Sequence, residues 1–141
     1  MLVLDASATI PWCFADEATE QTEALLDQVR QSGALVPSIW SLEVANVLLG
    51  AERRGRMTPT QTGSFFGLLD SLPITVAHIE HGDQVVAVLG LGRAHGLSSY
   101  DASYLQLAVA RGLPLATLDR RLREAALRIG AELVLSVSSP I

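Results

Sequence analysis

Residues 113–121, LPLATLDRR, begin as a largely apolar run and then stop on two polar side chains, Thr117 and Asp119. A run with so little alternation indicates a strand buried on both faces, because a strand with one solvent-exposed face alternates apolar and polar residues. Besides 113–118, comparable apolar runs occur at 2–4, 34–36, 74–79 and 132–135. The sequence therefore predicts a parallel sheet of about five strands.

Segments of helical length separate these runs, and this alternation is typical of proteins in which helices cover both faces of a parallel sheet. Several of these segments end at glycine, which is common just after a helix. No repeat or linker interrupts the pattern, so we expect residues 1–141 to form one domain with a three-layer α/β/α fold. We expect a short helix after Ser7 and longer helices at 19–32, 39–55, 58–71, 82–95, 99–111 and 119–129.

The composition restricts where the protein acts and what it contacts. No apolar stretch is long enough to span a membrane, and the N-terminus MLVLDASATI lacks the basic start of a signal peptide, so we expect a cytoplasmic protein without a membrane partner. The net charge of −5 alone disfavours a nucleic-acid partner. However, all ten basic residues are arginines, and seven of them lie in two clusters, at 53–56 and 120–128. A local basic surface is therefore compatible with the sequence.

The predicted helix at 39–55 carries two apolar stripes. One stripe consists of Trp40, Val44, Val47, Leu48 and Ala51, and the other of Leu42, Ala45 and Leu49. Since only one stripe can pack on the sheet, the second requires another helix, a second subunit or a partner chain.

Acidic residues lie where the predicted strands end. Asp5 follows one strand with Ser7 two residues later, and Asp119 follows another with Thr117 two residues earlier. Ligands of parallel α/β sheets bind beyond the carboxyl ends of the strands. Asp101 and Glu43 lie early in helices that should start at the same edge. Taken singly, the aspartates are also typical helix caps, but together the four residues predict one acidic site.

Four crowded carboxylates repel one another, and a divalent cation is the simplest way to offset that repulsion. Ligands that are all oxygen favour Mg²⁺, with Mn²⁺ as a possible substitute, over zinc. His78 and His81 lack a third ligand and are not expected to bind a metal.

The segments LVLDAS, SIWSLEVANVL, YDASYLQLA and LATLDRRL occur in an order that resembles the PIN-domain ribonucleases, particularly the VapC-type toxins of toxin–antitoxin pairs. The resemblance spans the chain, although residues 57–96 match only in architecture. It places Asp5, Glu43, Asp101 and Asp119 on the acidic quartet of the family, and Ser7, Asn46 and Thr117 on its supporting polar positions.

This resemblance implies metal-dependent hydrolysis of RNA, inhibition by a VapB-like antitoxin that occupies the site, and a homodimer. It makes Asp5 and Asp101 the expected direct metal ligands, with Glu43 and Asp119 holding water or a second ion. We expect Ser7, Asn46 and Thr117 to orient the carboxylates, unless they act only as local caps. The candidates for contacts to RNA phosphates are Arg53, Arg54 and Arg120.

Two other classes of protein deserve comparison. A receiver-like phospho-acceptor domain shares the architecture and an acidic pocket, but such domains need a lysine, and this chain has none. A non-catalytic PIN-like module that binds RNA or protein is the second alternative, and the presence of all four acidic positions disfavours it.

Overall fold

The computed structural model describes residues 1–135. The elements follow one another in the order β1 (Leu2–Leu4), α1 (Ala6–Thr9), the 3₁₀ helix η1 (Ile10–Trp12), α2 (Glu20–Ser32), β2 (Ala34–Pro37), α3 (Ile39–Arg53), α4 (Pro59–Ser71), β3 (Ile74–Ala77), α5 (Asp83–His95), α6 (Ser99–Arg111), β4 (Leu115–Ala116) and α7 (Arg120–Arg128).

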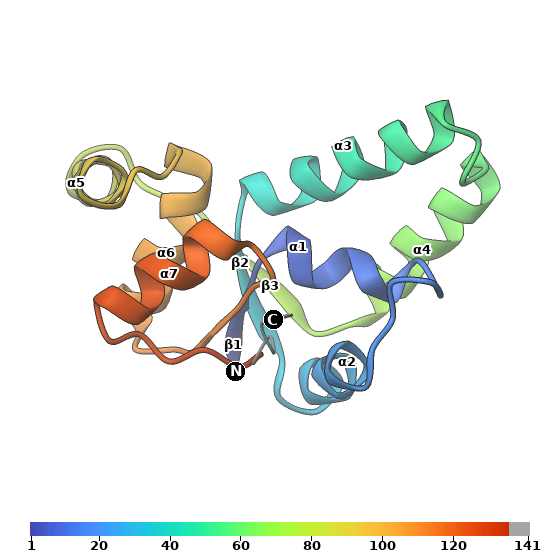
Figure 1. Ribbon diagram of the computed structural model, residues 1–141, viewed down its shortest axis with the longest axis horizontal. Helices are drawn as coiled ribbons and strands as arrows, with labels where there is room; N and C mark the ends of the chain where they lie inside the picture. The colour runs from blue at the N-terminus through green and yellow to red at the C-terminus, as the bar shows by residue number, and fades with distance from the viewer. Residues whose placement is uncertain (136–141) are drawn as a thin grey trace, which may run out of the picture.

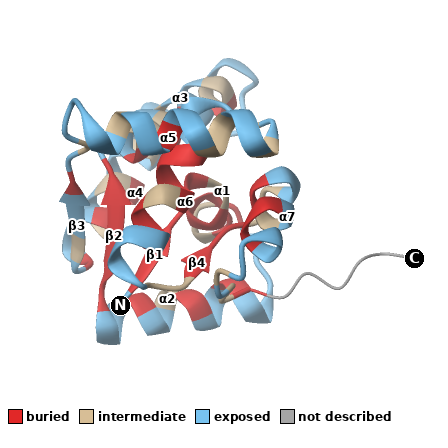
Figure 2. Cartoon of the chain, turned by 90° about the vertical axis from the view of Figure 1, so that its left-hand side faces the viewer, coloured by how far each residue is buried: buried red, intermediate tan, exposed pale blue. Residues whose placement is uncertain are grey.

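The strands form one parallel sheet in the order β3-β2-β1-β4. Strand β1 lies at the centre, where Val3 pairs with Leu35 on one side and Leu115 on the other. Helices α5, α6 and α7 lie on one side of the sheet and α1 to α4 on the other (Figure 1). All three residues of β1 are fully buried, and Figure 2 shows buried positions concentrated on the strands and on the helix faces towards them. The expected three-layer α/β/α fold is thus confirmed.

The number of strands is lower than predicted, because residues 1–135 contain four strands and an isolated bridge between Leu115 and Leu133. The Arg123 guanidinium ties the chain after this bridge to the end of β4, since it donates to the carbonyls of Thr117 (3.1 Å) and Leu135 (2.7 Å). Strand β3 is also shorter than predicted, and as an edge strand it leaves Val76 exposed.

The helices match the predicted segments to within about two residues, which is the usual uncertainty at helix ends. Thr19 and Thr58 start α2 and α4 with reciprocal capping boxes. Helices α5 and α6 end before Gly96 and Gly112, whose positive φ angles of 64° and 62° favour glycine. The short helix predicted after Ser7 begins at Ala6 and includes Ser7. Among residues 1–135, the helices are too short or too polar to cross a bilayer.

Helix α3 leaves one apolar face uncovered. Trp40, Val44, Leu48 and Ala51 are buried as predicted, but Val47 is not part of that stripe, because it points outward and is 40% exposed. Leu42 and Leu49 are also exposed, at 67% and 46%.

Replacing Arg123 with alanine is expected to lower the free energy of unfolding by about 1.5–3 kcal/mol, because two backbone carbonyls lose a charged donor. Urea unfolding measures this change. Arg128→Ala is the matched control, since Arg128 makes only an exposed ion pair with Glu124 at 3.9 Å. Equal effects of the two substitutions would contradict the bridging role of Arg123.

Candidate active site

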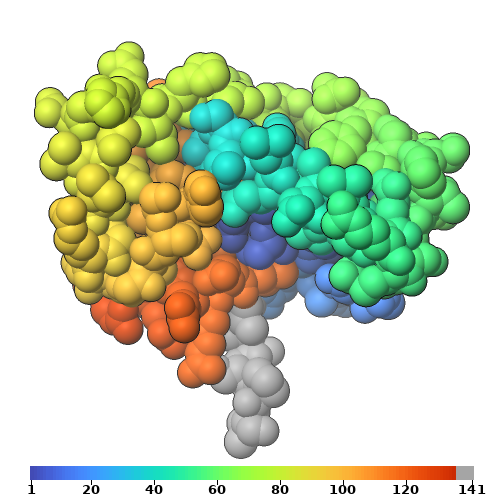
Figure 3. All heavy atoms as spheres, turned by 90° about the horizontal axis from the view of Figure 1, so that it is seen from above, coloured from blue at the N-terminus to red at the C-terminus, as the bar shows by residue number. Residues whose placement is uncertain are grey.

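Four carboxylates gather beyond the carboxyl ends of the strands. Asp5 follows β1 directly, Glu43 lies in the second turn of α3 after β2, Asp101 lies in the first turn of α6, and Asp119 precedes α7. Their charges act on one another: those of Asp119 and Asp5 raise the pKa of Asp101, and those of all three aspartates raise the pKa of Glu43. In Figure 3, the N-terminal segment is visible from this side between α3 and the chain around α6 and α7.

Asp5 is held by two hydroxyl groups. The Ser7 and Thr117 hydroxyls each donate to Asp5 Oδ2, both at 2.6 Å. Each hydroxyl oxygen also accepts from the backbone, Ser7 Oγ from the Leu118 N–H (2.9 Å) and Thr117 Oγ1 from the Asp119 N–H (3.0 Å). Because each hydroxyl has one proton, both protons are committed to the carboxylate. The network fixes one oxygen of Asp5, and among residues 1–135 no hydroxyl donates to Oδ1.

Helix capping explains these acidic residues only in part. The Asp5 side chain makes no cap hydrogen bond to α1, and Ser38 makes none to α3. In contrast, Asp119 Oδ1 accepts from the Leu122 N–H (2.9 Å) and caps α7. The cap of α6 is Ser98, whose Oγ accepts from the Asp101 N–H. Hence Asp5 and Glu43 have no capping role, while Asp119 uses one carboxylate oxygen for it.

The pKa values of three of the carboxyls lie above their ordinary values. For Asp5, Glu43 and Asp101 the main cause is burial, which disfavours the charged form, and repulsion by the neighbouring carboxylates adds to it. The hydroxyls of Ser7 and Thr117 partly oppose the rise in the pKa of Asp5. Among residues 1–135, none of the four carboxylates forms a salt bridge with a basic side chain. The site is therefore a half-buried concentration of negative charge.

The donor set fits a hard cation that keeps several waters. All the site's charged donors are carboxylate oxygens, which suit Mg²⁺ and Mn²⁺. In the part of the chain that the structure describes, no three His, Cys, Asp or Glu side chains are drawn together closely enough to hold an ion on their own. Mg²⁺ commonly binds through one or two carboxylates, with water and substrate phosphate completing its shell. The open arrangement of these carboxylates therefore fits an ion that keeps several waters better than an ion that protein ligands enclose completely.

The other predicted site residues lie further from this acidic group. Asn46 is exposed one turn beyond Glu43, and within residues 1–135 its side chain makes no hydrogen bond to the four carboxylates. Arg53 and Arg54 lie at the far end of α3, about 15 Å along the helix from Glu43. Arg120 points into solvent and pairs with Glu124 at 3.1 Å, a spacing of four residues that is readable from the sequence.

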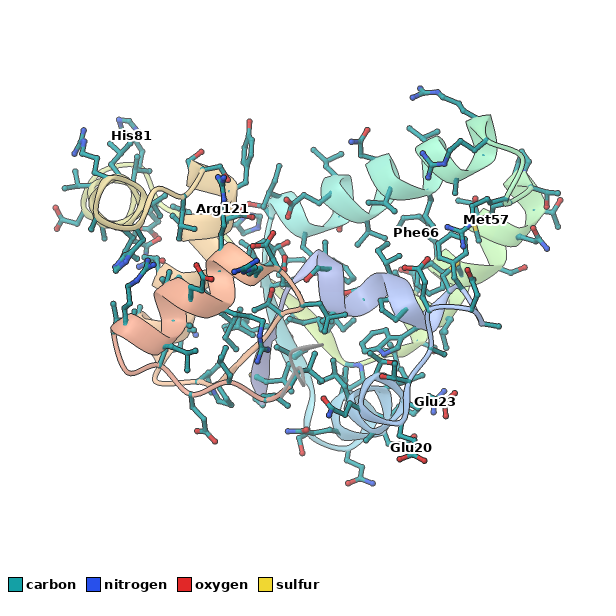
Figure 4. The ribbon with its side chains drawn as sticks, viewed as in Figure 1. Glu20, Glu23, Met57, Phe66, His81 and Arg121 are labelled. Carbon is teal, nitrogen blue, oxygen red and sulfur yellow. The ribbon has the colours of Figure 1, made fainter. Side chains whose placement is uncertain are left out.

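Two residues near the site carry roles that sequence reasoning missed. Arg121, at the first turn of α7, lowers the pKa of Asp101 through its charge, and its side chain rises beside the start of α6 (Figure 4). Tyr104 is fully buried, and its hydroxyl donates to Glu43 Oε1 at 2.5 Å. A signal for Tyr104 existed in the sequence, because a tyrosine in a buried helix needs a partner for its hydroxyl.

Comparisons with known proteins agree with this architecture. The model of the PIN domain family matches residues 2–127. Ribonuclease VapC3 of Pyrobaculum aerophilum is 31% identical over 123 residues, which cover 87% of this chain and 92% of that protein.

Three solved structures share the fold. The crystal structure of PAE2754 from Pyrobaculum aerophilum has a TM-score of 0.69 at 24% identity, covering 88% of this chain and 83% of that one. FitAcB from Neisseria gonorrhoeae has a TM-score of 0.62 at 18% identity, covering 94% and 96%. A toxin-antitoxin complex from Klebsiella pneumoniae has a TM-score of 0.56 at 16% identity, covering 84% and 87%.

We expect Asp101→Asn to stabilise the metal-free protein at neutral pH. The unfolded chain releases the Asp101 proton near pH 3.8, whereas the folded chain retains it to higher pH because the pKa is raised. Between these two pKa values the native state holds the extra proton, so its stability falls as pH rises, and the asparagine variant escapes this loss.

Urea unfolding in EDTA, from about pH 4 to about pH 8, measures the difference. It should grow with pH and should be absent for Asp70→Asn, which changes an exposed aspartate of α4. A variant no more stable than the wild type at the upper pH would contradict the expectation.

Proposed function

The chain belongs to the PIN domain family, and from this membership we propose that it is a metal-dependent endoribonuclease acting as the toxin of a toxin–antitoxin pair. The observation that carries the proposal is the group of Asp5, Glu43, Asp101 and Asp119 at the strand ends, which form no salt bridge among residues 1–135. Burial raises the pKa values of Asp5, Glu43 and Asp101. The ribonuclease name of the VapC3 relative and the toxin-antitoxin complex among the structures with this fold support it.

The residues divide the work of hydrolysis. Asp5 and Asp101 would hold the cation, and the hydroxyls of Ser7 and Thr117 keep the Asp5 carboxylate in one orientation. When bound, Mg²⁺ or Mn²⁺ supplies positive charge that offsets the charge developing on the phosphate oxygens. Asp119 and Asn46 orient water at the site. Without the cation, the four carboxylates would repel an incoming phosphate.

The bond changes are those of phosphodiester hydrolysis. Water attacks phosphorus in line with the leaving O3′ atom, the P–O3′ bond breaks, and the products carry a 5′-phosphate and a 3′-hydroxyl. Glu43 accepts the proton that the water loses, and solvent supplies the proton that O3′ gains. Burial raises the pKa of Glu43, and a base with a pKa nearer the working pH is the more effective proton acceptor.

Arginines provide the contacts to RNA phosphates. The charge of Arg121 lowers the pKa of Asp101, which indicates that Arg121 lies near the acidic group. Arg121 is therefore suited to contact the phosphate beside the cleaved bond. Arg53 and Arg54 lie about 15 Å away along α3, which suits phosphates further along the strand. Arg120 contributes a solvent-exposed guanidinium, which Glu124 partly neutralises. These arginines would offset the repulsion between RNA and a chain whose net charge is −5.

The uncovered face of α3 is the proposed surface of a homodimer. Leu42 and Leu49 are exposed, and together with Ile39 and Ala45 they line a hollow that also contacts Glu43. Exposed apolar surface of this kind marks protein contacts more often than isolated exposed leucines do. An antitoxin that occupies the site would cover the hollow from the side of Glu43.

Cleavage of total cellular RNA by the purified protein tests the nuclease. We expect discrete cuts with Mg²⁺ or Mn²⁺, none with EDTA, and a loss of about 100-fold or more in Asp5→Asn or Asp101→Asn, since outer-sphere partners alone contribute 10- to 100-fold. Asp70→Asn is the control. If folded Asp5→Asn and Asp101→Asn cut as fast as the wild type, the proposed site is wrong, and if wild type binds RNA without cutting it, the chain is a binding module.

The double substitution Leu42→Glu with Leu49→Glu is expected to convert a dimer into a monomer, because it places charges on the proposed contact. Light scattering after size-exclusion chromatography measures the mass. Leu127→Glu is the control, since Leu127 is an equally exposed leucine (66%) on α7. A dimer that survives the double substitution excludes this face of α3 as the contact.

A further inference from the structure

Tyr104 is a buried phenol at the edge of the acidic site. It lies three residues after Asp101 in α6, so the two side chains share one face of the helix. The tyrosine ring has no exposed surface, and it reaches from α6 to α3, where its hydroxyl donates to Glu43 Oε1 at 2.5 Å. This hydrogen bond joins α6 to α3 through two residues that lie 61 positions apart in the sequence.

The direction of the hydrogen bond follows from the chemistry of its two partners. The Tyr104 phenol donates, and the Glu43 carboxylate oxygen accepts. The same bond lowers the pKa of Glu43 and so partly opposes the effect of its burial.

Glu43 has few other restraints. Within residues 1–135, the Tyr104 hydroxyl is the partner found for the Glu43 carboxylate, whereas Asp5 has two hydroxyl donors. Glu43 also lies on α3 beside an exposed apolar hollow, and its side chain has more rotatable bonds than that of an aspartate. Without the phenol, the carboxylate would be free to turn into solvent.

We propose that Tyr104 is a positioning residue, which holds the Glu43 carboxylate at the acidic site by one oxygen and leaves the second oxygen available to the ion or its water. This inference rests on the proposed function, since it assigns a role within the same metal site. Tyr104 acts through Glu43 and does not itself contact the RNA or the ion.

Calorimetric titration with Mn²⁺ compares the wild type with Tyr104→Phe, which removes only the hydroxyl. We expect Mn²⁺ binding about 10-fold weaker, the lower end of the range for lost outer-sphere partners. With total RNA in Mg²⁺, kcat should fall while KM stays close to the wild-type value. Ser64→Ala is the control, because it also removes a single hydroxyl, from an exposed residue of α4 outside the hollow beside Glu43.

The Glu43→Ala background separates positioning from a general structural effect. If Tyr104 acts through Glu43, adding Tyr104→Phe to Glu43→Ala produces no further loss of Mn²⁺ affinity. Glu43→Asp is the second route to the same answer should Tyr104→Phe fail to fold. It keeps the charge, withdraws the carboxylate from the phenol, and should weaken Mn²⁺ binding to a similar degree.

Several results would overturn the inference. They are wild-type Mn²⁺ affinity and kcat in folded Tyr104→Phe, an equal loss in the Glu43→Ala background, or unchanged affinity in Glu43→Asp. In each case the wild type still binds Mn²⁺ and cuts RNA, so the proposed function stands. If the wild type neither binds Mn²⁺ nor cuts RNA, the proposed function and this inference both fall.

Discussion

A buried carboxylate at the end of the central strand is the constraint on which the structure depends. Asp5 is 4% exposed, and a buried charge without hydrogen-bond donors costs far more than a fold of this size can tolerate. The donors come from Ser7, two residues later, and from Thr117, which is 112 residues away. Strand β4 must therefore end where it does, because Thr117 has to turn its hydroxyl towards Asp5.

The charged carboxylates of the acidic site lower the stability of the folded chain. Burial and mutual repulsion raise the pKa values of Asp5, Glu43 and Asp101, and each raised pKa reflects a charged form that the folded state disfavours. Proteins usually retain such conflicts at functional sites, where the remainder of the fold compensates for them. Here the compensation comes from a fully buried central strand and from the helices packed on both of its faces.

Sequence patterns predicted the features that repeat along the chain. The apolar runs located β1, β2, β3 and β4, and helical periodicity with caps located the helices from α2 to α7. The rule that ligands bind at strand ends led to the prediction that the acidic residues lie at one edge of the sheet. Features that depend on one long side chain were not predictable, since no periodicity encodes them. The Arg123 bridge between the Thr117 and Leu135 carbonyls and the contact of Tyr104 on α6 with Glu43 on α3 are both of this kind.

The hydrogen bonds around Asp5 also protect backbone amides of the loop before α7 from exchange with solvent. The backbone N–H groups of Leu118 and Asp119 lie outside any helix or strand, yet they donate to the hydroxyls that hold Asp5. These two amide hydrogens exchange with solvent when their hydrogen bonds to Ser7 Oγ and Thr117 Oγ1 open. Their exchange rates therefore report how often the site opens, independently of any substrate or metal.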